Sequence, residues 1–167
     1  MTLEDRSARP RIATPRSAEE VSELDKRIIE HLQTDGRRPF TQIAADLGVS
    51  EAAVRARTNR LIERGILQVV GVTDPLKLGF QQMAMIAIRC ESDQLVTVAE
   101  QIAEMPEVDY VVITAGSYDL LIETVCEDNE ALLVFLAERL RAIDGVRETE
   151  TFVYLRLVKQ TYQYGTR

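Results

Sequence analysis

The stretch SEAAVRARTNRL, residues 50–61, predicts a helix that begins after Ser50 and is stopped by Gly65. Serine is preferred immediately before a helix and glycine immediately after one. At about 100° per residue, one side of this helix is the side expected to be buried; it carries Val54, Thr58 and Leu61. The opposite side is small and basic, and it carries Ala52, Ala56 and Asn59, flanked by Ala53, Arg55 and Arg60.

The composition of this second side suggests a ligand. Small side chains let a backbone come close to a partner, and arginine suits phosphates or the acceptor edge of guanine. A solvated basic face on an ordinary surface helix would have the same composition. The helix by itself therefore leaves both interpretations open, and the residues around it have to decide.

The composition of the whole chain is that of an ordinary globular protein. Of its 167 residues, 46% are hydrophobic and 28% are charged. No run of apolar residues is long enough for a membrane span, and the first residues do not resemble a secretory signal. Cys90 and Cys126 lie in separate apolar runs without metal-ligand spacing, so both are expected to be reduced. We expect a cytoplasmic protein without a metal or cofactor.

The charge is divided unevenly along the chain. The net charge is −7, which by itself argues against a nucleic-acid-binding protein. Residues 1–70 nevertheless hold 12 Lys and Arg against 11 Asp and Glu, whereas residues 71–167 hold 8 against 16. The acidic residues thus belong to the second half, and the basic residues gather around the helix quoted above. Two domains, one of them facing DNA, fit this distribution better than a single acidic domain.

Two more helices are expected before the basic one. Ser22 and Asp25 have the spacing of a capping box, and the helix that follows has an apolar stripe that includes Ile28 and Leu32. Thr41 is expected to cap a short second helix, which Gly48 ends. The order of helix, connector, short helix, turn and basic helix is that of a helix-turn-helix. Residues 1–20 lack an apolar period and are expected to be a flexible tail, with arginines that could follow a DNA backbone.

Residues 24–67 resemble the DNA-binding domain of the Lrp/AsnC (feast/famine) family of transcriptional regulators. The marks of the resemblance are Leu24-Asp25, Asp35-Gly36-Arg37, Ile43-Ala44, Leu47-Gly48-Val49-Ser50, Val54, Arg57, Arg60-Leu61 and Gly65-Ile66. The residues expected to contact DNA are Ser50, Glu51, Ala52, Arg55, Ala56, Arg57, Asn59 and Arg60. Among them Arg57 points nearer the core, so it is also expected to hold the helices together.

A linker should separate the two domains. Residues 66–72 (ILQVVGV) read as a strand that Pro75 breaks, and the tract resembles the hinge of the family. We therefore expect a helix-turn-helix domain with its hinge strand over residues 21–75. Residues 76–167 would form the domain that binds an effector and forms oligomers.

The second half alternates between strand and helix patterns. Strands are expected over residues 83–90, 108–115, 119–126 and 146–159, and helices before Pro106 and after Asp128. A weak internal repeat relates residues 99–110 to residues 137–148, each a helix that leads into a strand. The order βαββαβ is ferredoxin-like, and it resembles the effector domain of the family, which is similar to ACT domains. The fold class is α+β.

A glycine turn is the candidate effector site. It comprises Thr114, Ala115, Gly116, Ser117, Tyr118 and Asp119. It resembles the Gly-x-Tyr-Asp turn with which family members bind an amino acid between subunits. Backbone N–H groups would take the carboxylate, Asp119 the ammonium, and Tyr118 would shape the pocket. Gly116 is expected to need a conformation that disfavours a β-carbon. A hairpin turn without a ligand has the same chemistry.

The sheet predicts an assembly. With both helices on one face, the other face would stay apolar and exposed, and Met83, Met85, Val112, Ile122 and Phe152 are assigned to this excess of apolar residues. Dimerisation through the sheets would cover it, as the resemblance also implies, with further stacking to octamers. Two basic helices per dimer would then read a two-fold symmetric operator in double-stranded DNA.

No catalytic constellation is visible in the sequence. The main prediction is therefore a DNA-binding transcriptional regulator that responds to a metabolite, most simply an amino acid, and not an enzyme. An architectural DNA-binding protein without an effector is an alternative. A third is an enzyme, since siroheme decarboxylases resemble the family in both domains. Such an enzyme would need histidine in its second domain, and the only histidine is His31.

Overall fold

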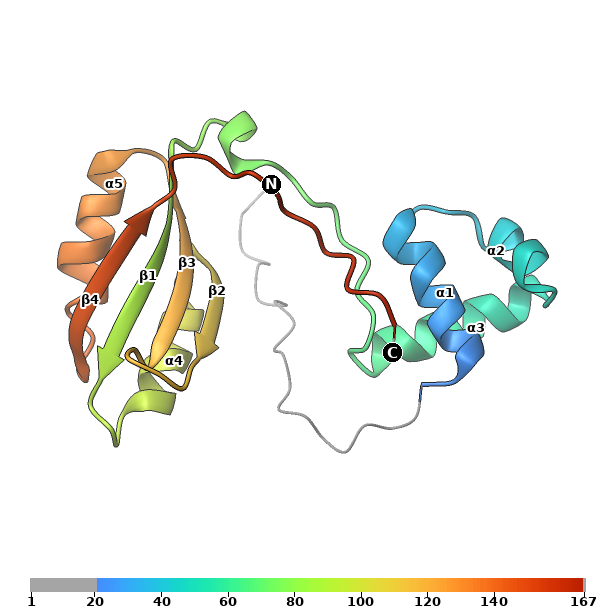
Figure 1. Ribbon diagram of the computed structural model, residues 1–167, viewed down its shortest axis with the longest axis horizontal. Coiled ribbons are helices and arrows are strands. Elements are labelled where there is room, and N and C mark those ends of the chain that lie inside the picture. The colour runs from blue at the N-terminus through green and yellow to red at the C-terminus, as the bar shows by residue number, and fades with distance from the viewer. Residues whose placement is uncertain (1–20, 167) are drawn as a thin grey trace, which may run out of the picture. The chain divides into compact units, whose positions relative to one another are not determined.

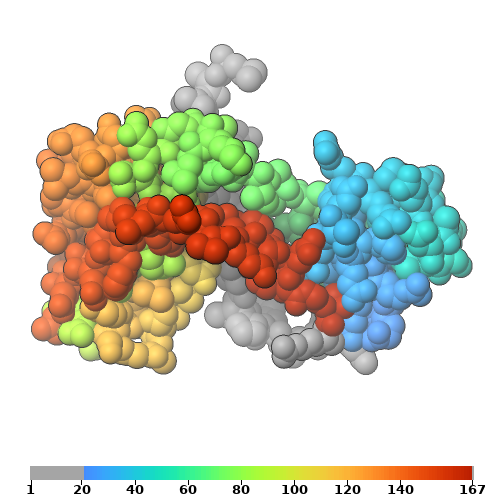
Figure 2. Space-filling view, turned by 45° about the horizontal axis from the view of Figure 1, so that its top comes forward, coloured from blue at the N-terminus to red at the C-terminus, as the bar shows by residue number. Residues whose placement is uncertain are grey.

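The computed structural model describes residues 21–166, which divide into two compact units (Figure 1). The first extends to Gly71 and takes in the residues from Gln160 onward, and the second comprises Val72–Lys159. The predicted tail of residues 1–20 lies outside the described residues. The predicted domain bounds stay a prediction; in the structure residues 160–166 group with the first unit, and the amide Nε2 of Gln163 donates to the carbonyl of Gln33 at 2.8 Å. Figure 2 shows the red C-terminal segment against the blue atoms of the first unit.

Three helices make up most of the first unit, and α1 (Glu23–Thr34) begins as predicted. The Ser22 hydroxyl accepts a hydrogen bond from the Asp25 amide at 3.2 Å, and the Asp25 carboxylate accepts one from the Ser22 amide at 3.3 Å. This is the capping box that the spacing predicted. The basic helix α3 (Glu51–Glu63) likewise begins after its predicted cap, because Ser50 accepts from the Ala53 amide.

Helix α2 (Phe40–Leu47) starts before the predicted cap, so the assignment of Thr41 as its cap is wrong. Pro39 stands at the cap position with φ −59°, and its carbonyl accepts hydrogen bonds from the amides of Gln42 and Ile43. The fixed φ of proline suits the entry to a helix. The helix therefore starts at once, and Thr41 lies within its first turn. The predicted end is confirmed, since Gly48 adopts the left-handed conformation with φ 67°.

The apolar stripes of the three helices meet in one core. Val54, Thr58 and Leu61, the predicted inner side of α3, are all at most 2% exposed. Val54 and Leu61 pack with buried residues of α1 and α2 and with one residue after α3, which are Ile28, Ile29, Leu32, Ile43, Ala44 and Leu67. This core fixes which side of α3 faces away from the unit.

The predicted strand over residues 66–72 is absent from the structure. Residues 67–74 have no regular secondary structure, and Val69, Val70 and Val72 are 50–69% exposed. The β-branched pattern favours an extended chain, but a strand also needs a neighbour to pair with, and the described residues pair none with this segment. A short 3₁₀ helix, η1 (Pro75–Leu78), follows, with Asp74 as its cap.

The second unit has the predicted βαββαβ order. Its strands are β1 (Gln82–Cys90), β2 (Val108–Ile113), β3 (Leu120–Cys126) and β4 (Val146–Val153). Helix α4 (Leu95–Ala103) follows β1, and α5 (Asn129–Val134) follows β3 and continues into η2 (Phe135–Leu140). The strands form one antiparallel sheet in the order β2-β3-β1-β4. The predicted ferredoxin-like fold is confirmed (Figure 1).

The helices cover one face of this sheet. Ile86 and Ile88 of β1 and Leu120 and Ile122 of β3 are fully buried there. The assignment of Ile122 to the uncovered face is wrong, because the register pairs Ile122 with Ile86 and so places both on the helix side. Phe135 is only 1% exposed and was missed by the sequence analysis. It begins the π-helical segment η2, in which the wider turn brings residue i+5, here the buried Leu140, over residue i.

The face without helices, which we call the open face, is more polar than predicted. Phe152 of β4 pairs with Met85 on it and is 49% exposed. By the alternation along each strand, however, this face also carries Arg89, Glu123, Glu148 and Glu150. Strand β4 ends at Val153 and not at the predicted Lys159, because β1 offers it no partner beyond the bond from the Tyr154 amide to the Met83 carbonyl.

Candidate nucleic-acid interface and effector site

The outward side of α3 is the first candidate site. The predicted contact residues Ala52, Arg55, Ala56, Asn59 and Arg60 are all exposed. A hollow on this side is lined by Glu51, Ala52, Arg55, Ala56 and Asn59. With no large side chain in its middle and arginines at its edge, the surface can approach a polyanion closely.

Arg55 is held in place on this surface. Its Nη2 lies 2.7 Å from Oε1 of Glu51, one turn earlier, and its guanidinium lies 5.2 Å from the ring centroid of Phe40 in α2. An exposed pair of this kind contributes little to stability. The pair does orient the Arg55 guanidinium. A phosphate that binds Arg55 would have to replace the Glu51 carboxylate.

Arg57 faces the first helix instead. Its Nη1 lies 2.9 Å from Oδ1 of Asp25 and 3.2 Å from Oγ of Ser22, so it joins α3 to the capping box of α1. Burial by itself raises the pKa of the Asp25 carboxyl, but the hydrogen bonds from Ser22 and Arg57 and the charge of Arg57 outweigh burial, and the pKa is lowered. The prediction that Arg57 holds the helices together is confirmed; its contact with DNA stays a prediction.

The predicted effector turn joins β2 to β3. The Thr114 amide donates to the Asp119 carbonyl at 2.9 Å, and the Thr114 hydroxyl donates to the Tyr118 carbonyl at 2.6 Å. The Asp119 amide donates in turn to the Ile88 carbonyl on β1. These bonds close the loop and fix it to the middle of the sheet.

One expectation about this turn needs correction, and the expected role of Asp119 toward an ammonium stays a prediction. Gly116 does not have a positive φ, and a β-carbon built on it would meet no atom within 4 Å. Its loop is open to solvent there, so a side chain is not disfavoured. The Asp119 carboxylate also already has a partner, since its Oδ2 accepts a hydrogen bond from the Cys90 amide at 2.8 Å. Burial, and second the charge of Asp119, raise the pKa of the Cys90 thiol, which keeps this cysteine protonated.

Arg89 was missed as a site residue by the sequence analysis. Its Nε donates to the Ser117 carbonyl at 2.7 Å, and its guanidinium lies 5.1 Å from the centroid of the Tyr118 ring. Its Nη1 lies 3.1 Å from Oε2 of Glu148, and the Tyr118 hydroxyl donates to Glu150. The hydrogen bond to Glu150 is the main cause that raises the pKa of Tyr118. The available signal was a single charge in an otherwise apolar strand, MAMIAIRC.

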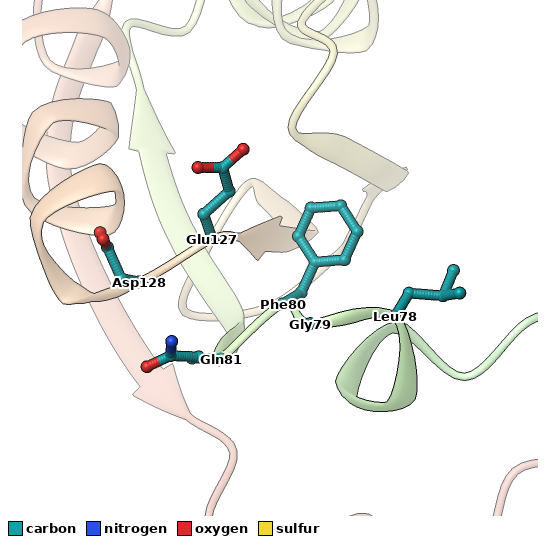
Figure 3. A pocket seen from close by; sticks show the side chains of 6 residues that line it. All are labelled: Leu78, Gly79, Phe80, Gln81, Glu127 and Asp128. Carbon is teal, nitrogen blue, oxygen red and sulfur yellow. The ribbon is translucent and has the colours of Figure 1, made fainter.

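The second unit has a hollow of its own where η1 leads into β1 (Figure 3). Its lining residues are Leu78, Gly79, Phe80, Gln81, Glu127 and Asp128. The Gln81 amide donates to the Glu127 carbonyl, and Asp128 caps α5. These polar groups thus already serve the fold. Among the described residues, no group of His, Cys, Asp and Glu could hold a metal ion, and no helix could span a membrane.

Fold and sites together define a class of protein: a helix-turn-helix domain followed by a ferredoxin-like ligand-binding domain. Residues 21–62 match the AsnC-type helix-turn-helix domain, and residues 83–164 match the Lrp/AsnC ligand binding domain. The chain belongs to the Lrp/AsnC family of transcriptional regulators.

Two relatives agree with this assignment, and two solved structures have a similar fold. An HTH-type transcriptional regulator of Pyrococcus horikoshii is 34% identical over 153 residues, which are 90% of this chain and 97% of the relative. The regulator LrpA of the same organism is 32% identical and covers 83% of this chain and 99% of its own length. The structure of Escherichia coli AsnC has a TM-score of 0.75 at 24% identity, over 85% of this chain and 97% of AsnC. A Neisseria meningitidis regulator solved as its L-Met complex has a TM-score of 0.76 at 22% identity, over 86% and 95%.

Proposed function

We propose that this regulator reads DNA with the outward side of α3. The proposal rests on the composition of this exposed side, while the other side of the helix is buried in the core. The exposed side carries Arg55, Asn59 and Arg60 together with the small residues Ala52 and Ala56. Arginine supplies the bidentate contact to guanine, and asparagine that to adenine. The proposed partner is a two-fold symmetric operator in double-stranded DNA.

The test is DNA binding by variants of this surface. An operator is first selected from random duplexes with the wild-type protein, and fluorescence anisotropy then gives affinities over a series of salt concentrations. Arg55→Ala and Arg60→Ala should each weaken binding, and loss of a phosphate contact should lower the salt slope by about 1. Arg147→Ala, at an exposed arginine of the second unit, is the matched control. Unchanged affinity in both α3 variants would refute the reading surface.

The second unit is proposed to bind a small metabolite, most simply an amino acid. The match to the family's ligand-binding domain supports this, as does the L-Met complex of the Neisseria meningitidis relative. A thermal-shift screen of the twenty amino acids tests it. A ligand at about 100 times its dissociation constant should stabilise the protein by about 2.7 kcal/mol.

We further propose that two copies associate through the open face of the sheet, and that dimers assemble further into octamers. Met85, Val112 and Phe152 supply apolar surface there, and Phe152 is half exposed. Val112→Asp should convert the assembly to monomers in sedimentation experiments, because an unpaired buried charge costs several kcal/mol. A wild-type protein that sediments as a monomer at micromolar concentration would refute this arrangement.

Two alternatives predict different results. An architectural DNA-binding protein would bind duplex DNA without any response to an amino acid. An enzyme similar to siroheme decarboxylases would turn over its substrate whether or not α3 carries its arginines. The family assignment favours the regulator, and we propose that it acts in the cytoplasm, where its DNA target would lie.

A further inference from the structure

The C-terminal residues 160–166, QTYQYGT, follow the second unit along the chain but belong to the first unit. Figure 2 shows them in red against blue atoms of the first unit. Residues 154–159, which lead to them, form neither helix nor strand, and Leu155 and Val158 are 98% and 87% exposed. The chain therefore passes between the two units a second time, after its first passage at Gly71.

Two side chains of residues 160–166 contact the last turns of α1. Nε2 of Gln163 donates to the Gln33 carbonyl at 2.8 Å, and the Thr166 hydroxyl donates to the Glu30 carboxylate. Glu30 and Gln33 are three residues apart, so they lie on one side of the helix. Gly165, between the two donors, has φ 71°, a conformation that glycine adopts without strain. The C-terminal backbone thus turns between two contacts with the same side of α1.

The bond to Gln33 satisfies a group that the helix itself leaves unsatisfied. The last four carbonyls of an α-helix have no partner within it. Because α1 ends at Thr34, these carbonyls belong to residues 31–34. Gln163 supplies a donor to one of them from a position 130 residues further along the chain. This end of a helix also carries the negative end of its dipole, so it favours donors and cations over carboxylates.

Helix α1 connects this contact with α3. At its first turn, Asp25 holds Arg57 of α3. At its other end, Val69 of the linker lies near Gly36, because a β-carbon built on Gly36 would lie 3.6 Å from Cγ1 of Val69. Both segments that lead to the second unit therefore come to the same end of α1. A hydrogen-bonded helix is a rigid element, so a displacement of this end is carried to Arg57.

The other end of the C-terminal segment is attached to the sheet. The Tyr154 amide donates to the Met83 carbonyl at 2.8 Å. Burial, and second a hydrogen bond to Glu123, raise the pKa of the Tyr154 hydroxyl to about 12, so it stays a donor at neutral pH. The chain is thus held at Tyr154 and again at Gln163, with an exposed stretch between the two positions.

We propose that residues 160–166 are a docking segment for the last turns of α1, and that this contact carries the state of the second unit to α3. The regulatory part rests on the proposed effector function, whereas the docking itself does not. A change in the sheet on ligand binding reaches the docking segment through Tyr154. Docking or release of the segment then changes how firmly α1 holds Arg57.

Hydrogen exchange on the full chain tests the docking with a pair of opposite charges. Gln163→Glu replaces the donor with a carboxylate, so peptides from the last turn of α1 should exchange about 2- to 10-fold faster, the range for one hydrogen bond. Gln163→Lys keeps a donor and adds a positive charge, so exchange should stay at the wild-type rate or become slower. Tyr164→Ala, at a side chain that is 83% exposed, is the matched control and should match the wild type.

DNA binding tests the regulatory part. Fluorescence anisotropy measures the affinity of each variant for the selected operator, with and without the amino acid that the thermal-shift screen identifies. Coupling between two sites typically changes affinity by about 5- to 150-fold. In Gln163→Glu this factor should fall toward one, although calorimetry still detects binding of the amino acid. Gln163→Lys and Tyr164→Ala should keep the factor of the wild type.

The results separate the two parts of the proposal. Exchange in Gln163→Glu at the wild-type rate, or faster exchange in both charge variants, would overturn the docking. An unchanged coupling factor in Gln163→Glu would overturn the regulatory part alone. If no amino acid binds the wild type, the proposed effector function fails and the regulatory part fails with it, while the exchange rates still decide the docking.

Discussion

Replacing Arg57 with alanine should destabilise the first unit. Arg57 joins α3 to α1 through a 2.9 Å ion pair with Asp25, and the two side chains are 31% and 12% exposed. Exposed pairs contribute about 0–1 kcal/mol, and breaking a fully buried pair costs about 3–5 kcal/mol. Asp25 keeps its bonds to Ser22 after the substitution, so its carboxylate is not left without a partner. We therefore expect a cost of about 1–3 kcal/mol.

Hydrogen exchange resolves this loss from the rest of the molecule. Amides of α1 and α3 that exchange only on unfolding should do so about 5- to 150-fold faster in Arg57→Ala, since 1.4 kcal/mol corresponds to a factor of about ten. Peptides from the four strands of the second unit serve as the internal reference. Arg60→Ala is the matched control, because Arg60 lies exposed on the same helix; surface changes of this kind stay within about 0.5 kcal/mol.

A double-mutant cycle decides whether the ion pair is the cause. If Arg57→Ala acts through Asp25, it should cost much less in an Asp25→Asn background. Exchange in Arg57→Ala that matches the wild type, or equal losses in both backgrounds, would refute the reasoning. DNA affinity measured in parallel separates the two roles: Arg57→Ala should lower stability and affinity together, and Arg60→Ala affinity alone.

Three further results follow from the structure. Because the folded pKa of Asp25 is lowered, its contribution is complete above its unfolded pKa of about 3.9 and is lost as the pH falls through the folded pKa; acid titration of wild type and Arg57→Ala should show their stabilities converging there. Phe135→Ala should cost about 3–5 kcal/mol in denaturant unfolding of the second unit, because Phe135 is 1% exposed in the core; a loss under 1 kcal/mol would contradict this packing. Gly116→Ala should leave the melting temperature nearly unchanged, because the φ of Gly116 is not positive and the space beside it is open. A drop of several degrees would mean that this position does require glycine.

The internal repeat shows why the fold of the second unit could be predicted from the sequence. Ile102 and Leu140, which correspond in the two repeats, are both fully buried against the sheet. Each repeat has an apolar helix stripe followed by a β-branched strand. Few packing arrangements of helix and sheet bury both the stripe and the strand. The predictions were wrong where the local sequence pattern does not decide how strands pair. Residues 66–72 have a strand-like pattern without a strand to pair with, and Ile122 has the right chemistry for either face.

The candidate sites divide in the same way. The sequence alone determined the helix-turn-helix, the caps at Ser22 and Ser50, and the exposed side of α3. Each of these depends on local features, namely hydrogen bonds between residues close in sequence and the apolar period of a helix. Only the tertiary structure decided that Arg89 lies beside the effector turn. Arg89 and Glu148 are 59 residues apart along the chain, and sheet register, which brings them together, depends on how whole strands pair rather than on any local pattern.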